Sequence, residues 1–156
     1  MSQSFTQTFL VVPARQGVGL TSVALGIVRA LQRNGVDVRF AKPVAQEIGD
    51  TSVHFAREIF PAAVPEAIPL QDVAEQVAAN QTNELMEEIV TLCMNAGDGA
   101  SVLVVEGLHT DPAHPFTSQL NIDTARSLKA EVVVVADARA PSAAADLRLT
   151  ISQYVN

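Results

Sequence analysis

Tryptophan is absent from this chain of 156 residues, and cysteine occurs once, at Cys93. A single cysteine cannot form a disulfide within the chain, and its apolar neighbours Leu92 and Met94 indicate a buried helical position. The aromatic content of 4% leaves few rings on which nucleic-acid bases could stack. Basic residues are also scarce, and the formal net charge of −7 disfavours binding to a phosphate backbone. These absences argue against a general nucleic-acid-binding protein.

Long hydrophobic runs are missing as well. The longest, such as residues 132–136, are far shorter than the roughly 20 residues that a membrane-spanning helix needs. The first eight residues contain no basic side chain and no apolar stretch, so they do not resemble a secretory signal. We therefore expect a cytoplasmic protein with no membrane partner. With 48% hydrophobic and 17% charged residues, the chain should form one compact globular unit.

Short β-branched segments alternate with segments of helical periodicity. The apolar run 8–12 is typical of a strand buried on both faces, whereas 36–41 alternates with period two and indicates a strand nearer a sheet edge. This alternation predicts an α/β fold, with a parallel sheet covered by helices on both faces. Strands are expected at 8–12, 36–41, 101–105 and 131–136, and helices at 21–34, 50–60, 70–79, 82–96, 117–128 and 143–155.

Two features limit this prediction. Pro61, Pro65 and Pro69 predict irregular structure up to Leu70, where a helix begins. About four strands are recognisable where a sheet usually has ~5–6, and the last predicted helix is followed by no strand. We therefore expect residues 1–156 to form one domain that is a fragment of a longer protein.

The segment between the first strand and the first helix has the context of a phosphate-binding loop. In such loops, small residues let backbone N–H groups converge on phosphate oxygens at a helix N-terminus, a lysine reaches the phosphates, and the next Ser or Thr holds Mg²⁺. Leu20 occupies the lysine position here, so we expect weak anion binding but no nucleotide turnover. The alternative is a turn kept only for packing. The predicted loop residues are Ala14, Arg15, Gln16, Gly17, Val18, Gly19, Leu20 and Thr21.

Further polar residues follow other predicted strands. Lys42 comes after the second strand with Asp50 soon after it, and Glu106 ends the third. Singly, they could be a solvated loop charge, a helix cap and a loop acid. Because open α/β sheets bind ligands at the carboxyl ends of their strands, we expect these residues to share one site, where the carboxylates would suit Mg²⁺. His109, Asp111 and His114 flank prolines in a loop without helical register, so we expect no zinc site there.

Four segments together resemble the N-terminal domain of long bacterial phosphate acetyltransferases: PARQGVGLTS (13–22), FAKPVAQ (40–46), LMEEI (85–89) and LVVEGL (103–108). The resemblance implies a parent acyltransferase that converts acetyl-CoA and phosphate to acetyl phosphate and CoA through a C-terminal acetyltransferase domain outside this chain. It implies no catalytic residue here. The N-terminal domain of that family is associated with regulation by metabolites and with oligomer organisation.

The domain is also similar to dethiobiotin synthetase, a phosphate-loop enzyme. This likeness implies that Thr21, Asp50 and Glu106 hold metal-ligand positions and that Lys42 holds a substrate-binding position. The expected cofactor is at most a vestigial nucleotide, or an anion with Mg²⁺. A non-catalytic regulatory domain, with a homo-oligomer and a metabolite effector as partners, is the leading interpretation. The alternatives are an ATP-dependent synthetase of the dethiobiotin synthetase or cobyrinic acid amidase type, and a purely structural oligomerisation piece.

Overall fold

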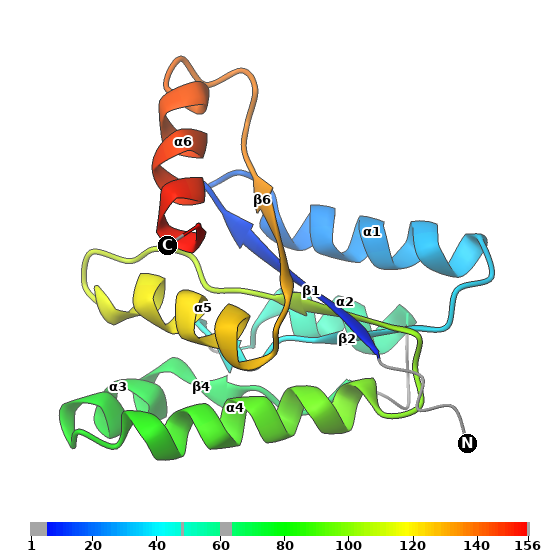
Figure 1. Cartoon of the computed structure of the whole chain (residues 1–156), viewed down its shortest axis with the longest axis horizontal. Helices are drawn as coiled ribbons and strands as arrows, with labels where there is room; N and C mark the ends of the chain where they lie inside the picture. Colours follow the sequence, from blue (N-terminus) through cyan, green and yellow to red (C-terminus); the bar gives the residue numbers. More distant parts are fainter. Residues whose placement is uncertain (1–5, 48, 60–63, 156) are drawn as a thin grey trace.

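The computed structural model describes residues 6–47, 49–59 and 64–155. Its centre is a four-stranded parallel sheet in the order β2-β5-β1-β6 (Figure 1). The α/β prediction is confirmed, and the alternating segment 36–41 does lie at an edge of this sheet. The four strands are β1 (Gln7–Pro13), β2 (Val38–Ala41), β5 (Val102–Glu106) and β6 (Glu131–Val135).

The two central strands are buried on both faces, as their continuous apolar sequences predict. Side chains alternate along a strand, so Leu10 and Val12 of β1 face one hydrophobic cluster while Val11 faces the other. In β5, Leu103 and Val104 divide in the same way. A sheet with two apolar faces requires helices on both, which explains why the sequence reads as alternating strands and helices.

Five helices cover these faces. On one face lie α1 (Leu20–Arg33) and α2 (Thr51–Ile59); on the other lie α3 (Leu70–Ala78), α4 (Thr82–Gly97) and α5 (Phe116–Ser127). Cys93 of α4 is fully buried, which confirms its predicted core position, and this burial raises the pKa of its thiol to about 12. Within the described ranges, no helix combines the length and the apolar composition that crossing a membrane requires.

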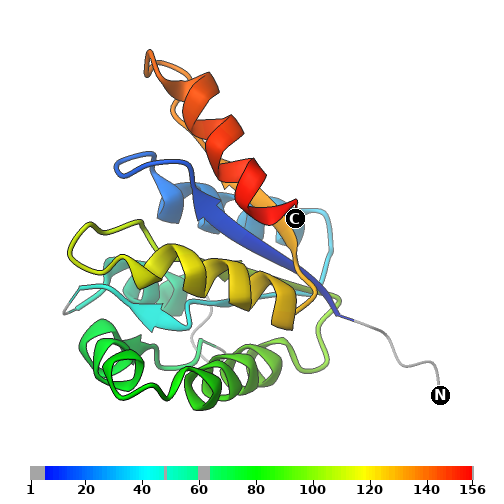
Figure 2. The same ribbon diagram turned by 60° about the vertical axis from the view of Figure 1, so that its left-hand side comes forward.

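The sixth helix, α6 (Ala143–Tyr154), contacts β6 at the edge of the sheet (Figure 2). None of its residues is fully buried, and Leu149 and Ile151 are 68% and 46% exposed. The valines of β6 at positions 132–134 are only half-buried. This edge therefore presents more apolar surface to solvent than the centre of the sheet does.

One local prediction is wrong. Regular structure was predicted to resume only at Leu70, but a strand precedes it: β3 (Val44–Ala45) pairs in parallel with β4 (Ile68–Pro69). The N–H of Ile68 donates to the carbonyl of Pro43 at 2.8 Å. A proline is tolerated in so short a strand because it need not donate there. The predicted start of α4 at Thr82 is confirmed, and Gln81, which precedes the helix, makes no side-chain cap bond. Pro61 and the end of the predicted helix at residue 60 lie outside the described residues.

Candidate functional site

The segment 14–21 connects β1 to α1 and is held by neighbouring loops. The N–H of Ala14 donates to the carbonyl of Val135 at 2.8 Å, and the Nε2 of Gln16 donates to the carbonyl of Thr110 at 2.8 Å. The residue that immediately precedes α1, Gly19, has φ of 77°, a left-handed conformation that favours glycine. A Cβ atom at Gly19 would meet no atom within 4 Å, so the backbone angle, not space, requires glycine.

Leu20 lies in the core instead of lining the loop. Its side chain is 1% exposed and belongs to the same hydrophobic cluster as Ala24 and Val28 of α1. The residue at the lysine position of a phosphate loop thus contributes here to helix packing. Because Leu20 is apolar and buried, this position gives the loop no positive charge.

Leu20→Lys is expected to lower the free energy of unfolding by about 1.5–3 kcal/mol, the value of burying one leucine side chain. The long lysine side chain should extend out of the core toward the loop, where its positive charge should strengthen phosphate binding. Urea unfolding and phosphate titration of the loop amide NMR signals measure the two effects. Val23→Lys, at a position 37% exposed on the same helix, is the control and should cost much less. A Leu20→Lys variant as stable as wild type would show that Leu20 is not needed in the core.

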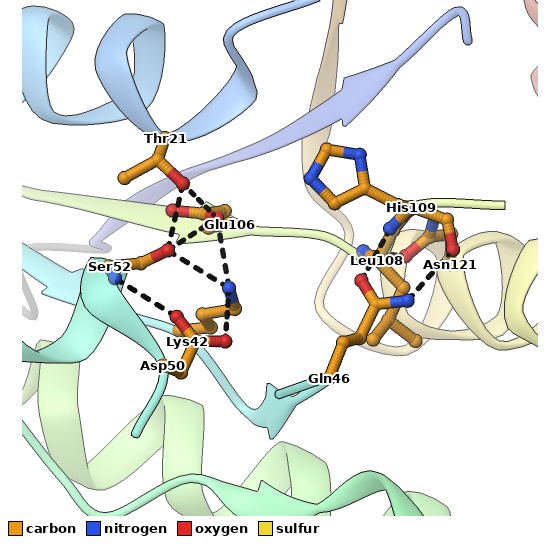
Figure 3. Close-up of polar contacts among 9 residues, drawn as sticks. All are labelled: Thr21, Lys42, Gln46, Asp50, Ser52, Glu106, Leu108, His109 and Asn121. Atoms are coloured by element: carbon orange, nitrogen blue, oxygen red, sulfur yellow. Dashed lines mark hydrogen bonds and ion pairs between the residues drawn. The ribbon is translucent and has the colours of Figure 1, made fainter. Parts of the chain in front are cut away.

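Lys42 lies at the centre of a buried polar cluster (Figure 3). It follows β2, is 4% exposed, and its Nζ lies 2.7 Å from Oδ2 of Asp50 and 3.1 Å from Oε1 of Glu106. Nζ also donates to Oγ of Ser52 at 3.0 Å. The interpretation of Lys42 as a solvated loop charge is therefore wrong. Burial of an ammonium is tolerated because each of its three N–H donors has an acceptor.

Glu106, the last residue of β5, accepts the other hydrogen bonds that link the side chains of this cluster. Its Oε1 accepts from Oγ1 of Thr21 at 2.9 Å and from Oγ of Ser52 at 3.1 Å, and the two hydroxyls lie 2.8 Å apart. Its Oε2 is buried without a hydrogen-bond partner among the described residues. Glu106 is 1% exposed, so its charge is compensated mainly by Lys42.

Asp50 precedes α2, as the cap interpretation predicts, and its Oδ1 accepts the N–H of Ser52 at 3.0 Å. Burial by itself would raise the pKa of Asp50. The hydrogen bond and positive charge of Lys42, together with the bonds from Ser52, outweigh burial and hold this pKa below its ordinary value of 3.8. Asp50 therefore stays ionised at neutral pH.

A second polar contact fixes the loop after β5. The side-chain amide of Asn121 accepts from the N–H of Leu108 at 2.8 Å and donates to the carbonyl of Leu108 at 2.9 Å. Gln46 makes the same pair of bonds to His109: its Oε1 accepts the N–H at 2.6 Å, and its Nε2 donates to the carbonyl at 3.0 Å. Burial, with the charge of Lys42, lowers the pKa of His109, so its ring is neutral at pH 7. These amides orient the backbone beside Glu106, as Figure 3 shows.

The structure thus brings together Thr21, Lys42, Asp50 and Glu106, which the sequence placed at one sheet edge. Arg15, in contrast, lies at the start of α6: its Nη1 donates to Oγ of Ser142, the residue before this helix, at 3.1 Å and lies 3.8 Å from Oδ2 of Asp146. Metal binding by Thr21, Asp50 and Glu106 stays a prediction, as does anion binding at the loop. Within the described ranges, no three His, Cys, Asp or Glu side chains form a group that could hold a metal ion.

The sequence did not identify Ser52, Gln46 or Asn121. Ser52 had one usable signal, its place two residues after Asp50 at the start of a predicted helix. Gln46 and Asn121 contact residues 63 and 13 positions away, and no local pattern indicates such contacts.

An open pocket of about 770 Å³ adjoins this cluster. It lies beside β3, α2 and α3, and Asp50 of the cluster lines it together with Gln46. His54 and Arg57 of α2 supply basic groups to its wall, while Glu66 supplies an acid. The volume is within the range of small-molecule sites.

Comparison with known proteins gives a consistent match. A family model described as an AAA domain matches residues 7–156. The chain is 40% identical over 133 residues to the phosphate acetyltransferase of Deinococcus radiodurans, covering 83% of this chain and 19% of that protein. The phosphate acetyltransferase of Pseudomonas aeruginosa is 37% identical, with 82% and 19% covered, and that of Escherichia coli is 34% identical, with 83% and 19% covered. The chain spans about a fifth of the length of these curated relatives.

Proposed function

Because this chain belongs to the AAA domain family and matches the N-terminal domain of phosphate acetyltransferases, we propose that it is the non-catalytic regulatory and oligomerisation domain of such an enzyme. The parent enzyme would convert acetyl-CoA and phosphate to acetyl phosphate and CoA in an acetyltransferase domain outside this chain. The relatives are about five times longer than the matched segment, which is consistent with a further domain.

The burial of Leu20 is the observation that carries this proposal. Phosphoryl transfer depends on positive charge placed at the transferred phosphate, and electrostatic effects of this kind are usually the largest in catalysis. Leu20 supplies no charge, and Lys42 is already bonded to two carboxylates. The loop retains backbone donors and a helix N-terminus, which support weak anion binding but not turnover.

The chain is expected to be inactive in two assays. Purified protein should form no acetyl phosphate from acetyl-CoA and phosphate, and should hydrolyse no ATP in the presence of Mg²⁺. The full-length relative of Escherichia coli, assayed alongside, is the positive control for acetyl transfer. Turnover that rises in proportion to this protein, and that survives further purification, would refute the non-catalytic role; ATP turnover would instead favour the synthetase alternative.

The regulatory part of the proposal rests on the pocket beside Asp50. Its volume of about 770 Å³ and its mixed basic and acidic wall suit a small polar metabolite. Deleting the matched segment from a long relative should leave acetyl transfer intact and abolish any response to metabolites. Loss of acetyl transfer in a folded deletion variant would place catalytic residues in this segment.

Self-association through the β6 and α6 edge is expected. Edge strands and exposed apolar helices favour pairing, and Leu149, Ile151 and Val155 are all exposed on this side. Light scattering over a concentration series should show a rising mass, and Leu149→Asp should reduce the rise. Met94→Asp, at a position 66% exposed on α4, is the control. A constant monomeric mass at the highest concentration would contradict an oligomerisation role for this edge.

A further inference from the structure

Lys42 places an ammonium group between the two acids that a metal ion would need. Its Nζ lies 2.7 Å from Asp50 and 3.1 Å from Glu106, and the three side chains are 5%, 8% and 0% exposed. A magnesium ion would have to lie about 2.0–2.1 Å from carboxylate oxygens. Since both acids already contact Nζ, the ammonium and a metal ion would compete for one position.

The bonding of the oxygens supports the ammonium as the occupant. Oε1 of Glu106 accepts from Lys42, Thr21 and Ser52, so its lone pairs are fully used. Oδ1 of Asp50 accepts the N–H of Ser52. Oε2 of Glu106 is the one buried carboxylate oxygen of the described residues that has no partner, and a single oxygen does not make a metal site. Thr21, Asp50 and Glu106 are suitable ligand types, but as arranged here they do not fit a metal ion.

We propose that Lys42 supplies the resident cation of this centre and excludes divalent metal ions from it. An anion at the loop would then bind to backbone N–H groups without a metal. Removing the ammonium would leave Oδ2 of Asp50, Oε1 of Glu106 and Oγ of Ser52 facing one position, which is a hard-oxygen donor set suited to Mg²⁺ or Mn²⁺. The inference concerns metal binding alone, so it can fail while the proposed regulatory function stands.

Manganese binding, followed by the electron paramagnetic resonance signal of free Mn²⁺, tests the proposal. Lys42→Met should bind Mn²⁺ at least about tenfold more tightly than wild type, equivalent to ~1.4 kcal/mol. Lys129→Met is the matched control, because Lys129 is the other lysine of the sequence and is exposed; it should behave as wild type. Adding Glu106→Gln to Lys42→Met should abolish the gain and so locate the ion. No gain in a folded Lys42→Met variant would overturn the proposal.

A measurement on the wild-type chain keeps the proposal testable even where Lys42→Met does not fold. Thermal unfolding of wild type and Glu106→Gln is compared with and without Mn²⁺. A ligand that binds only the folded state raises the melting temperature of a protein. Because Lys42 excludes metal ions from the centre of wild type, the melting temperature of wild type should respond to Mn²⁺ no more than that of Glu106→Gln. A rise in wild type that Glu106→Gln removes would show a resident metal site and overturn the proposal.

Discussion

Lys42→Met is expected to lower the free energy of unfolding of this chain by about 3–5 kcal/mol at neutral pH, the usual result of removing one partner from a buried ion pair. The variant would leave Asp50 and Glu106 close together with no positive charge between them. Methionine retains most of the length of the lysine side chain, so the loss reports the charge more than the packing. Urea unfolding followed by circular dichroism measures it.

The control for this prediction is Lys129→Met, at an exposed position, which should change the free energy of unfolding by no more than about 0.5 kcal/mol. A second comparison uses Lys42→Met with Glu106→Gln, which should recover part of the lost stability because one buried charge is gone. If Lys42→Met were no less stable than Lys129→Met, the buried cluster would not hold the ammonium as described.

The loss should also depend on pH, in a direction that the pKa of Asp50 determines. This pKa is held below 3.8 in the folded chain by the bond and charge of Lys42 against the effect of burial. The interaction therefore stabilises the fold above the ordinary pKa, and its contribution is lost as the pH falls through the lowered pKa. The stability difference between wild type and Lys42→Met should accordingly shrink below about pH 3.8. A difference that stays constant between neutral and acid pH would attribute the loss to packing.

Gly107→Ala is expected to destabilise the chain by about 1–3 kcal/mol, as overpacking of a filled core does. A Cβ atom at Gly107 would lie 2.9 Å from Oδ1 of Asn121, 3.0 Å from Cγ1 of Val12 and 3.1 Å from the carbonyl oxygen of Val11. The Val11 carbonyl cannot easily move, because it accepts the N–H of Gly107 at 2.8 Å. Asn121 is fixed as well by its two bonds to Leu108.

Urea unfolding again measures the effect, with Gly26→Ala as the matched control. Gly26 lies within α1, and a Cβ atom there would meet nothing within 4 Å. Alanine in a helix interior is favoured over glycine, so this control should gain about 0.5–1 kcal/mol. Equal stability of the two variants would mean that the loop after β5 adjusts freely, and that its close packing against Asn121 does not position Glu106.

Much of the fold could be predicted from the sequence because its causes are local. The continuous apolar run in β1 and the helical periodicity from Thr21 to the stop at Asn34 specify element types before any tertiary contact exists. The common location of Thr21, Lys42, Asp50 and Glu106 follows from these elements, since parallel strands bring their carboxyl ends to one edge. The pairing of β3 with β4 was missed because two-residue strands carry too little pattern to be recognised.

The sequence by itself determined the α/β class, the phosphate-loop position without its lysine, and the four polar residues that belong to one sheet edge. Tertiary structure alone decided that Leu20 is part of the core, that Lys42 is buried between two carboxylates, and that Ser52 joins them. The physical reason is the sequence distance of these contacts: Thr21 and Lys42 bind Glu106 from 85 and 64 residues away. Whether a lysine is solvated or paired depends on which distant side chains the fold brings to it, and no local pattern contains that information.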